Sequence, residues 1–365
     1  MPLVPPYIES LRPYQPGKPI EEVKRELGLT NIIKLASNEN PLGPSKLAIE
    51  EMRRHLDDLH YYPNGGLTLR EVLAERFHLK VGNVIAGSGS EGIMSNIIRT
   101  FLLDDDEVLT TEAAFIGFQV LARSRGVKYT TVPYKNWRYD LEAISGKIND
   151  HTKIIYLANP NNPTGTIFTK QEFDTFYKTV PERVLIILDE AYFEYAQGNP
   201  EYPDSMHYRY DNVITLRSFS KVYGLAGARI GYGFAHDRLI SNLLKVKLPF
   251  EPGSLAQAAG IGSLQDAEFL KRSLDVNNKG MKYLFAAFTD LELDPVPSSA
   301  NFIMIARESE HDAEWLYNEL LKKGLIIRPL KSFGLPNCLR ITIGTEEQNH
   351  MLVDAMKTIL AKSYA

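Results

Sequence analysis

Short, continuous apolar runs recur along the first two thirds of the chain, and helical stretches separate them. The runs at 153–158 and 184–188 are rich in β-branched residues and leucine and show no polar alternation. Strands that are buried on both faces of a parallel sheet have this composition. The stretch 170–179 between them reads as a helix. The pattern therefore predicts an α/β fold with a mainly parallel central sheet flanked by helices.

Further elements complete this prediction. Strands are expected at 107–111, 128–133, 213–217 and 229–234, and the segment 84–92 reads as a strand, a Gly/Ser turn and the start of a helix. Ser45 is a plausible N-cap for the helix that follows the turn at 41–44.

The alternation of apolar runs and helical stretches changes after about residue 255. A long charged helix is expected at 266–289, strands at 300–305 and 339–343, and helices at 311–323, where Gly324 ends the helix, and at 346–362. We expect a smaller α+β domain at 261–365, a large domain at 41–260, and an N-terminal arm at 1–40 with one short helix near 20–27. The arm has too little hydrophobic content to fold alone, so we expect it to pack with the small domain.

Composition narrows the class of protein. The 365 residues are 44% hydrophobic and 24% charged, which is ordinary globular composition, and the net charge is −4. Without a long basic run, neither nucleic acid nor an anionic membrane is an expected partner. Apolar runs too short to span a bilayer and an N-terminus without signal-peptide features indicate a cytoplasmic protein. The single Cys338 excludes an internal disulfide, and the histidine spacing predicts no metal site.

Candidate chemistry centres on Lys221. It closes a run in which Ser218 and Ser220 supply hydroxyls, and a glycine-rich segment leads on to Arg229. A lysine amine forms the Schiff base with pyridoxal phosphate, and an arginine with small hydroxyl residues holds the phosphate. The surface is the usual place of a lysine, but the nearby glycines favour close backbone packing instead.

Asp189 follows the apolar run 184–188, so its carboxylate lies at the sheet edge where open α/β sheets bind ligands. There it could pair with a protonated pyridine nitrogen and keep the ring a good electron sink. A helix N-cap or a salt bridge is the commoner role of an isolated strand-end aspartate. Tyr192 could reach the ring's phenolic oxygen, or be a half-buried core tyrosine.

Two turns add donors. Asn162 lies in a Pro/Gly turn after the strand 153–158, where its amide could donate to the ring oxygen; a plain turn is the alternative. The turn at 87–91 offers free backbone N–H groups at a helix start. It matches neither the dinucleotide pattern nor a nucleotide P-loop, which favours a smaller phosphate.

Arg340 is an arginine inside a strand pattern, and Arg328 lies in a similar but weaker context. Either side chain could point to solvent, as charged residues in half-buried strands usually do, or form a bidentate clamp for a carboxylate or phosphate.

The motifs resemble the fold type I pyridoxal phosphate aminotransferases nearly end to end, and most closely those that act on histidinol phosphate. Besides the segments above, LRPYQPGKP at 11–19, KLASNENPLG at 34–43 and SFGLPN at 332–337 carry the likeness. The resemblance implies transamination of L-histidinol phosphate with 2-oxoglutarate, giving imidazole-acetol phosphate and glutamate, in histidine biosynthesis. It also implies a homodimer with shared active sites.

The resemblance also implies a role for each residue. Lys221 would be the Schiff-base lysine and proton shuttle, Asp189 the partner of the pyridine nitrogen, and Tyr192 and Asn162 the ligands of the ring oxygen. The remaining assignments are Ser90, Glu91, Ser218, Ser220 and Arg229 at the phosphate, Phe115 on the ring face, Tyr62 at the partner subunit's phosphate, and Arg340 on the substrate anion with Tyr14 and Arg328 beside it.

Two segments depart from the family's pattern. Ala113 and Ala114 stand where the family usually has Pro-Thr, and Ser88, Glu91 and Gly92 alter the usual Gly-Asn-Gly-Ser-Asp-Glu turn. Both changes touch the seat of the cofactor, but backbone donors survive them, so binding should persist.

Three alternatives remain at this point. A pocket that accepts an imidazole also accepts a phenyl ring, so an aromatic amino-acid aminotransferase is the nearest rival. Threonine-phosphate decarboxylase is a lyase on the same scaffold. A cofactor-binding regulator would need an extra DNA-binding domain, for which the chain offers neither a spare segment nor a basic patch.

Overall fold

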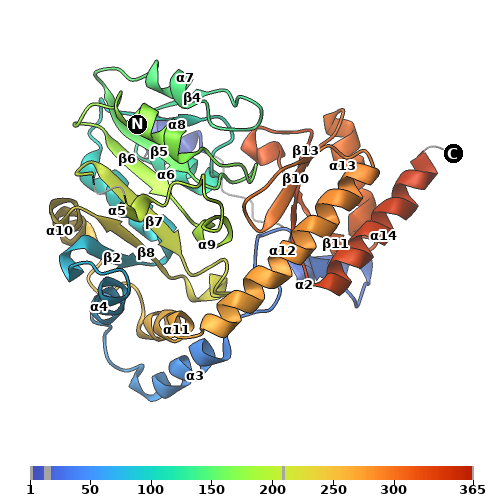
Figure 1. The fold of residues 1–365 in the computed structure, drawn as a ribbon, viewed down its shortest axis with the longest axis horizontal. Helices are drawn as coiled ribbons and strands as arrows, with labels where there is room; N and C mark the ends of the chain where they lie inside the picture. Colours follow the sequence, from blue (N-terminus) through green and yellow to red (C-terminus); the bar gives the residue numbers. More distant parts are fainter. Residues whose placement is uncertain (1–2, 12–17, 208–209, 364–365) are drawn as a thin grey trace.

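A seven-stranded and a four-stranded β-sheet form the centres of the two parts of the chain (Figure 1). The computed structural model describes residues 3–11, 18–207 and 210–363. The larger sheet has seven strands in the order β2-β8-β7-β6-β5-β3-β4. Their bounds are β2 (Val84–Gly87), β3 (Glu107–Thr111), β4 (Lys128–Val132), β5 (Thr152–Ala158), β6 (Leu185–Asp189), β7 (Val213–Ser218) and β8 (Gly231–Ala235). All neighbouring pairs are parallel except the two that involve β8, which runs antiparallel to β2 and β7.

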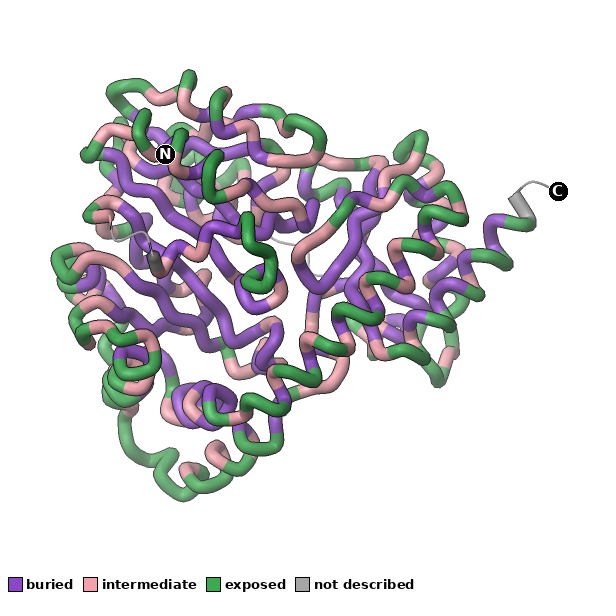
Figure 2. The backbone as a smooth tube through the Cα atoms, in the orientation of Figure 1, coloured by how far each residue is buried: buried purple, intermediate pink, exposed green. Residues whose placement is uncertain are grey.

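Helices cover both faces of this sheet. One face packs against α5 (Gly89–Phe101), α6 (Ile116–Ser124) and α10 (Asp237–Val246). The other face packs against α4 (Leu67–Arg76), α7 (Leu141–Ser145), α8 (Lys170–Tyr177) and α11 (Ser254–Leu264), and α3 (Lys46–Arg54) lies against α11. Every residue of β2, β3, β6 and β7 is buried, as the tube in Figure 2 shows for the strands between their helices. Burial on both faces explains the continuous apolar run in β6.

The second sheet is antiparallel and has four strands in the order β12-β13-β10-β9. Their bounds are β9 (Pro295–Val296), β10 (Phe302–Ala306), β12 (Arg328–Pro329) and β13 (Cys338–Thr342). It shares a core with α12 (Ala267–Asp290), α13 (Glu310–Lys322) and α14 (Glu346–Ser363). Beside it, β1 (Ile33–Lys34) pairs in parallel with β11 (Leu325–Ile326). This pair ties the N-terminal segment to the second sheet.

The long helix α12 connects the two parts of the chain. Leu270 and Leu274, near its start, pack against the core between the larger sheet and α11, whereas Leu284 and Phe288 lie in the core of the second sheet. Figure 1 shows α12 passing from the neighbourhood of α11 and α3 to that of α14. One helix therefore contributes to the cores of both sheets.

Local signals account for several boundaries. The Ser45 hydroxyl accepts from Ala48 N at 3.0 Å and caps α3, as predicted. Thr169 and Glu172 form a capping box at α8. Gly324, at φ +76°, follows the end of α13. The predicted helix near 20–27 is α2 (Ile20–Leu27).

The structure differs from the predicted strand at 229–234. Arg229 has φ 52° in the left-handed region and follows the short 3₁₀ turn Ala226–Ala228, so β8 begins only at Gly231. The described residues also form two short helices, α1 (Pro6–Glu9) and α9 (Phe193–Ala196).

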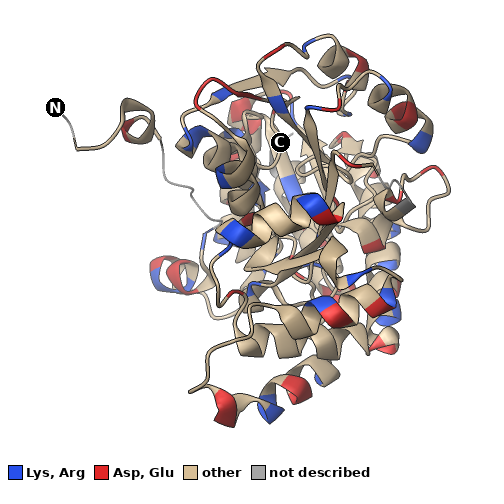
Figure 3. Cartoon of the chain, turned by 90° about the vertical axis from the view of Figure 1, so that its left-hand side faces the viewer, with Lys and Arg blue, Asp and Glu red and all other residues tan. Residues whose placement is uncertain are grey.

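Charged side chains of both signs are interspersed along the helices, without a continuous band of one sign in the view of Figure 3. Within the described residues, no helix combines the length and the apolar composition that crossing a membrane would require.

Candidate active site

A cavity of about 240 Å³ opens at the carboxyl ends of β5, β6 and β7. It brings ten of the fourteen predicted site residues together. They are Ser90, Glu91, Phe115, Asn162, Asp189, Tyr192, Ser218, Ser220, Lys221 and Arg229. Strand ends and the loops that follow them supply most of this lining, which is the usual place for a ligand in an open α/β sheet.

Asp189 ends β6 and forms the floor of the cavity. It lies between Ala158 of β5 and Leu216 of β7 and is 5% exposed. The Tyr156 hydroxyl donates to Asp189 Oδ2 at 2.6 Å, and Ala191 N donates to Oδ1 at 3.2 Å. The side chain is therefore not a helix cap, since Tyr192 takes the N-cap position of α9.

The pKa of the Asp189 carboxyl is raised to about 6, mainly by burial and to a smaller extent by the charge of Glu91. The two hydrogen bonds and the charge of Lys221 act in the opposite direction on this pKa. Burial makes the charged form of this carboxyl unfavourable when it has no partner. A cation in the cavity, such as a protonated ring nitrogen, would therefore stabilise the charged form strongly.

Tyr156 is a site residue that sequence reasoning missed. Its ring stacks on Phe118 with centroids 4.1 Å apart, which fixes the hydroxyl toward Asp189. The pairing of β5 with β6 indicates this contact. Tyr156 and Ala158 lie on the same face of β5, and Ala158 pairs with Asp189.

Lys221 lies in the loop after β7, with Nζ 3.5 Å from Ser37 O and 5.5 Å from the centroid of the Tyr192 ring. Its loop is tightly held. Asn40 Nδ2 donates to Val222 O at 2.7 Å. Gly224, at φ +68°, packs so closely that a Cβ there would lie 2.1 Å from Gly43 O. The loop thus holds Lys221 in the wall of the cavity, and its amine does not extend to the surface as that of most lysines does.

The opposite end of the cavity carries the predicted phosphate residues. Ser90 is in the first turn of α5, and Gly231 of β8 packs against it, because a Cβ at Gly231 would lie 2.5 Å from Ser90 N. Ser218 Oγ accepts from Ser220 N at 3.0 Å. Arg229 Nη2 lies 3.2 Å from Glu91 Oε2. A guanidinium, hydroxyls and a helix N-terminus together form an anion-binding set.

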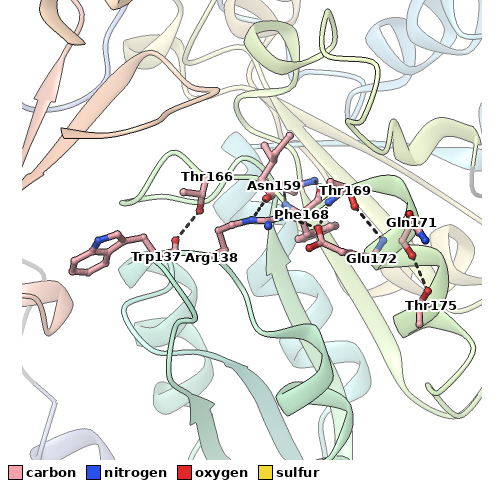
Figure 4. A network of polar contacts seen from close by, with 10 residues as sticks. Trp137, Arg138, Asn159, Thr166, Phe168, Thr169, Gln171, Glu172 and Thr175 are labelled. Carbon is pink, nitrogen blue, oxygen red and sulfur yellow. Dashed lines mark hydrogen bonds and ion pairs between the residues drawn. The ribbon is translucent and has the colours of Figure 1, made fainter. Parts of the chain in front are cut away.

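The side chain of Asn159 holds together the two ends of the loop that carries Asn162 (Figure 4). Asn159 Oδ1 accepts from Phe168 N at 3.1 Å, and Asn159 Nδ2 donates to Phe168 O at 3.3 Å. Thr166 Oγ1 donates to Trp137 O at 2.8 Å and ties the loop to its neighbour. Asn162 is therefore placed by a fixed loop, and Oδ1 of its side chain accepts from Arg340 Nη1.

The Arg340 side chain points into the protein, which excludes the alternative that it points to solvent. It is 5% exposed, and Nη2 donates to Ala36 O at 2.9 Å. Arg328 is 7% exposed and is the direct cross-strand partner of Arg340. Both guanidinium carbons lie 5.9 Å from the centroid of the Phe333 ring. Two buried arginines thus lie on one face of the second sheet, beside the Asn162 wall of the cavity.

Tyr62 does not line the cavity. Tyr62 is 80% exposed and stacks on Phe250 with centroids 4.3 Å apart. Tyr14 lies outside the described residues. Among residues 3–11, 18–207 and 210–363, no group of His, Cys, Asp or Glu side chains is arranged to hold a metal ion.

Asn38 is a second residue that sequence reasoning missed. Its Nδ2 donates to Tyr192 Oη at 2.8 Å, and its backbone N–H donates to Thr342 Oγ1 at 2.9 Å. Asn301 Nδ2 donates to the backbone carbonyl oxygen of Asn38 at 3.0 Å. Asn38 therefore links Tyr192 to the second sheet. The segment 34–43 was noticed only as part of a resemblance, which gave Asn38 no role.

Comparison with known proteins identifies the family. Residues 30–356 match the profile described as aminotransferase class I and II. The chain belongs to this family. It is an aminotransferase with the fold type I architecture.

Close relatives cover nearly the whole chain. A histidinol-phosphate aminotransferase of Nitrosococcus oceani is 41% identical over 356 residues, which is 97% of this chain and 95% of that protein. One from Brevibacillus brevis is 43% identical over 350 residues, covering 95% of each. The structure is similar to that of Sinorhizobium meliloti histidinol-phosphate aminotransferase in complex with pyridoxal-5'-phosphate, with a TM-score of 0.90, 28% identity, and coverage of 100% of this chain and 99% of that chain.

Proposed function

We propose that this aminotransferase transfers the amino group of L-histidinol phosphate to 2-oxoglutarate with pyridoxal 5'-phosphate as cofactor, giving imidazole-acetol phosphate and glutamate in histidine biosynthesis. The observation that carries the proposal is the cavity that joins Lys221, Asp189 and Arg229. Relatives that are 41–43% identical over nearly the full length, and named for this reaction, support the choice of substrate.

The residues of the cavity fit the cofactor. A buried carboxylate on the floor, an amine in the wall and an anion-binding set at one end match the pyridine nitrogen, the aldehyde and the phosphate. Lys221 would hold it covalently, Asp189 would pair with the ring nitrogen, and Phe115 would lie on the ring face. Tyr192 and Asn162 would bind the ring oxygen, and Ser90, the Glu91 backbone, Ser218, Ser220 and Arg229 would hold the phosphate.

When bound, pyridoxal phosphate supplies an electron sink for the carbon that loses its proton. Once the substrate's amino group has taken its place, Lys221 Nζ would be free to remove this proton and return it, because it lies inside the cavity and its loop is positioned by the Asn40 contact. Asp189 would keep the ring nitrogen protonated, and Tyr156 would hold the carboxylate in place for that purpose.

Arg340 and Arg328 would bind the anionic end of each substrate, with Tyr14 beside them. Histidinol phosphate presents a phosphate, and glutamate presents carboxylates, so one site must accept both groups. A guanidinium fork binds either group through two parallel hydrogen bonds. The burial of both arginines strengthens such an interaction relative to one in water.

We also propose a homodimer in which Tyr62 reaches the partner's phosphate site. Around Tyr62, several large apolar side chains are 48–67% exposed: Leu56, Leu59, Tyr61, Leu248 and Phe250. A second copy of the chain would cover this surface. Light scattering on the purified protein tests this proposal, and a monomer at micromolar concentration would contradict it.

The division of the chain is proposed along the same lines: an arm at 1–40 that packs with the small domain, a large cofactor-binding domain at 41–260, and a small domain at 261–365. The β1–β11 pair and the two separate cores support this division.

Two experiments test the reaction. Specificity constants for histidinol phosphate, phenylalanine and threonine phosphate should rank histidinol phosphate first, with 2-oxoglutarate as acceptor. A higher value for phenylalanine would favour the aromatic alternative, and release of carbon dioxide from threonine phosphate would favour the lyase.

The second experiment replaces the base. Lys221→Ala should lose the visible absorption of the lysine-bound cofactor and nearly all transamination, while Lys245→Ala, on the exposed face of α10, should retain both. Full turnover by Lys221→Ala would refute the assignment.

A further inference from the structure

The guanidinium of Arg229 already has an anionic partner in the cavity. Its Nη2 lies 3.2 Å from Glu91 Oε2, and the two side chains are 50% and 45% exposed. Nη1 also donates to Ala226 O at 3.1 Å. One edge of the guanidinium is therefore anchored to its own loop, and the other faces a carboxylate where the proposed phosphate would bind.

Two glycines make room for this pair. A Cβ at Gly89 would lie 2.8 Å from Arg229 Nη2, and a Cβ at Gly117 would lie 2.4 Å from Glu91 Oε1. Real Cβ atoms essentially never approach other atoms so closely, so any larger residue at either position would displace the ion pair. The two glycines therefore leave room for the Glu91 carboxylate and the Arg229 guanidinium in the positions that they take.

The length of the Glu91 side chain also matters. Glu91 lies in the first turn of α5, where a negative charge is favourable at the helix N-terminus. A glutamate carries its carboxylate one methylene further than an aspartate does, and here it reaches Arg229.

We infer that the Glu91 carboxylate is an internal competitor for Arg229, which the cofactor's phosphate displaces when it binds. The inference rests on the proposed cofactor site and concerns what the side chain of Glu91 does there, whereas only its backbone was assigned to the phosphate. A carboxylate and a phosphate repel each other at contact distance, so they cannot both occupy the same edge of one guanidinium favourably. Cofactor binding is thus an exchange of anions, which lowers the affinity for phosphate-bearing ligands.

The test is the dissociation constant of pyridoxal phosphate for the cofactor-free protein, measured by absorbance and by quenching of protein fluorescence at low ionic strength. Glu91→Gln keeps the reach of the side chain and removes its charge, and Glu91→Asp keeps the charge and withdraws it from Arg229. Both changes should lower the dissociation constant, Glu91→Gln by about three- to tenfold, because an exposed ion pair and a repulsive contact are both removed.

Glu172→Gln is the matched control. Glu172 pairs with Arg138 at 2.6 Å, and the side chains are 43% and 40% exposed, close to the values for Glu91 and Arg229. The pair lies in the network of Figure 4, outside the cavity lining, and a glutamine can still serve in the capping box of α8. Glu172→Gln should leave the dissociation constant unchanged.

Two further measurements isolate the phosphate. Pyridoxal, which has no phosphate, should bind the wild type and both Glu91 variants equally. Inorganic phosphate should raise the melting temperature of Glu91→Gln more than that of the wild type, and the difference should shrink in high salt.

The outcomes separate the two proposals. If the wild type fails to bind pyridoxal phosphate, the proposed function fails. If it binds, and the Glu91 variants bind equally or more weakly, or gain affinity for pyridoxal to the same extent, the inference about Glu91 is wrong.

Discussion

The hydrogen bond from Tyr156 to Asp189 offers a sharp test of how the cavity floor is held. Tyr156→Phe removes only the hydroxyl and keeps the ring that stacks on Phe118. The 2.6 Å contact joins two buried groups, so no water can replace the lost donor without rearrangement. The expected cost depends on whether the Asp189 carboxyl is ionised.

The sign of this dependence follows from the pKa of Asp189. Burial raises it from the usual 3.8 to about 6 in the folded protein. The folded state therefore holds a proton more tightly than the unfolded chain, and the associated stability, about 3 kcal/mol, is fully present below pH 4 and lost as the pH rises through about 6. Removing the Tyr156 donor raises the pKa of Asp189 further, because this hydrogen bond favours the charged form.

The two protonation states then give different magnitudes. At pH 8, where Asp189 is ionised, Tyr156→Phe should lower the free energy of unfolding by about 1.5–3 kcal/mol, as for a hydrogen bond to a charged group. At pH 4.5, where the carboxyl is protonated, the cost should fall to about 0.5–1.5 kcal/mol, as for a neutral pair. Urea denaturation of the cofactor-free protein at both pH values measures the difference.

Tyr139→Phe is the control for this experiment. Tyr139 is also buried, and its hydroxyl accepts from Ala158 N at 3.1 Å, a neutral partner. Its cost should be the same at both pH values. A Tyr156→Phe cost that is equal at pH 4.5 and pH 8, or larger at pH 4.5, would refute the reasoning that Tyr156 stabilises an Asp189 anion.

Two further predictions concern the surroundings of the cavity. Arg217→Met should lower the free energy of unfolding by about 3–5 kcal/mol, because it leaves Glu190, which is 2% exposed, without its ion-pair partner. Urea denaturation measures this cost, and a value below about 1 kcal/mol would contradict the role of the buried ion pair. Gly224→Ala should cost about 1–3 kcal/mol or more, since Gly224 has φ +68° and no room for a Cβ, whereas Gly227→Ala, with no atom within 4 Å, should stay within about 0.5 kcal/mol. Thermal melts of both glycine variants check this pair, and equal melting temperatures would contradict it.

Strands buried on both faces were the most predictable part of the fold. β5 and β6 begin and end within one residue of the predicted strands, because a continuous apolar run favours a strand that is buried on both faces. β3 coincides with its predicted strand as well. The reversed direction of β8 was not predictable in the same way. Strand direction depends on the path of the connection 219–230, which folds back on the same edge of the sheet to carry Lys221.

The cavity lining could be predicted for the same reason that the strands could. Side chains at the ends of neighbouring parallel strands must meet at one edge, so Asp189, Asn162 and Ser218 are brought together once the sheet exists. Asn38 could not be placed this way, because its partners Tyr192 and Thr342 are 154 and 304 residues away in the sequence. The direction of the Arg340 side chain likewise depended on the register of β13.

The alternation of side chains along β7 explains why a buried ion pair lies directly behind the cavity. Ser218 faces the cavity, and its neighbour Arg217 must point to the opposite face. There Arg217 Nη2 lies 2.8 Å from Glu190 Oε2, and its guanidinium carbon is 3.3 Å from the centroid of the Phe193 ring. Glu190 directly follows Asp189, so the pair joins the end of β6 to β7 one residue away from the carboxylate on the cavity floor. The spacing between Asp189 and Ser218 is therefore fixed from both sides of the sheet, by strand pairing within it and by a buried charge pair behind it.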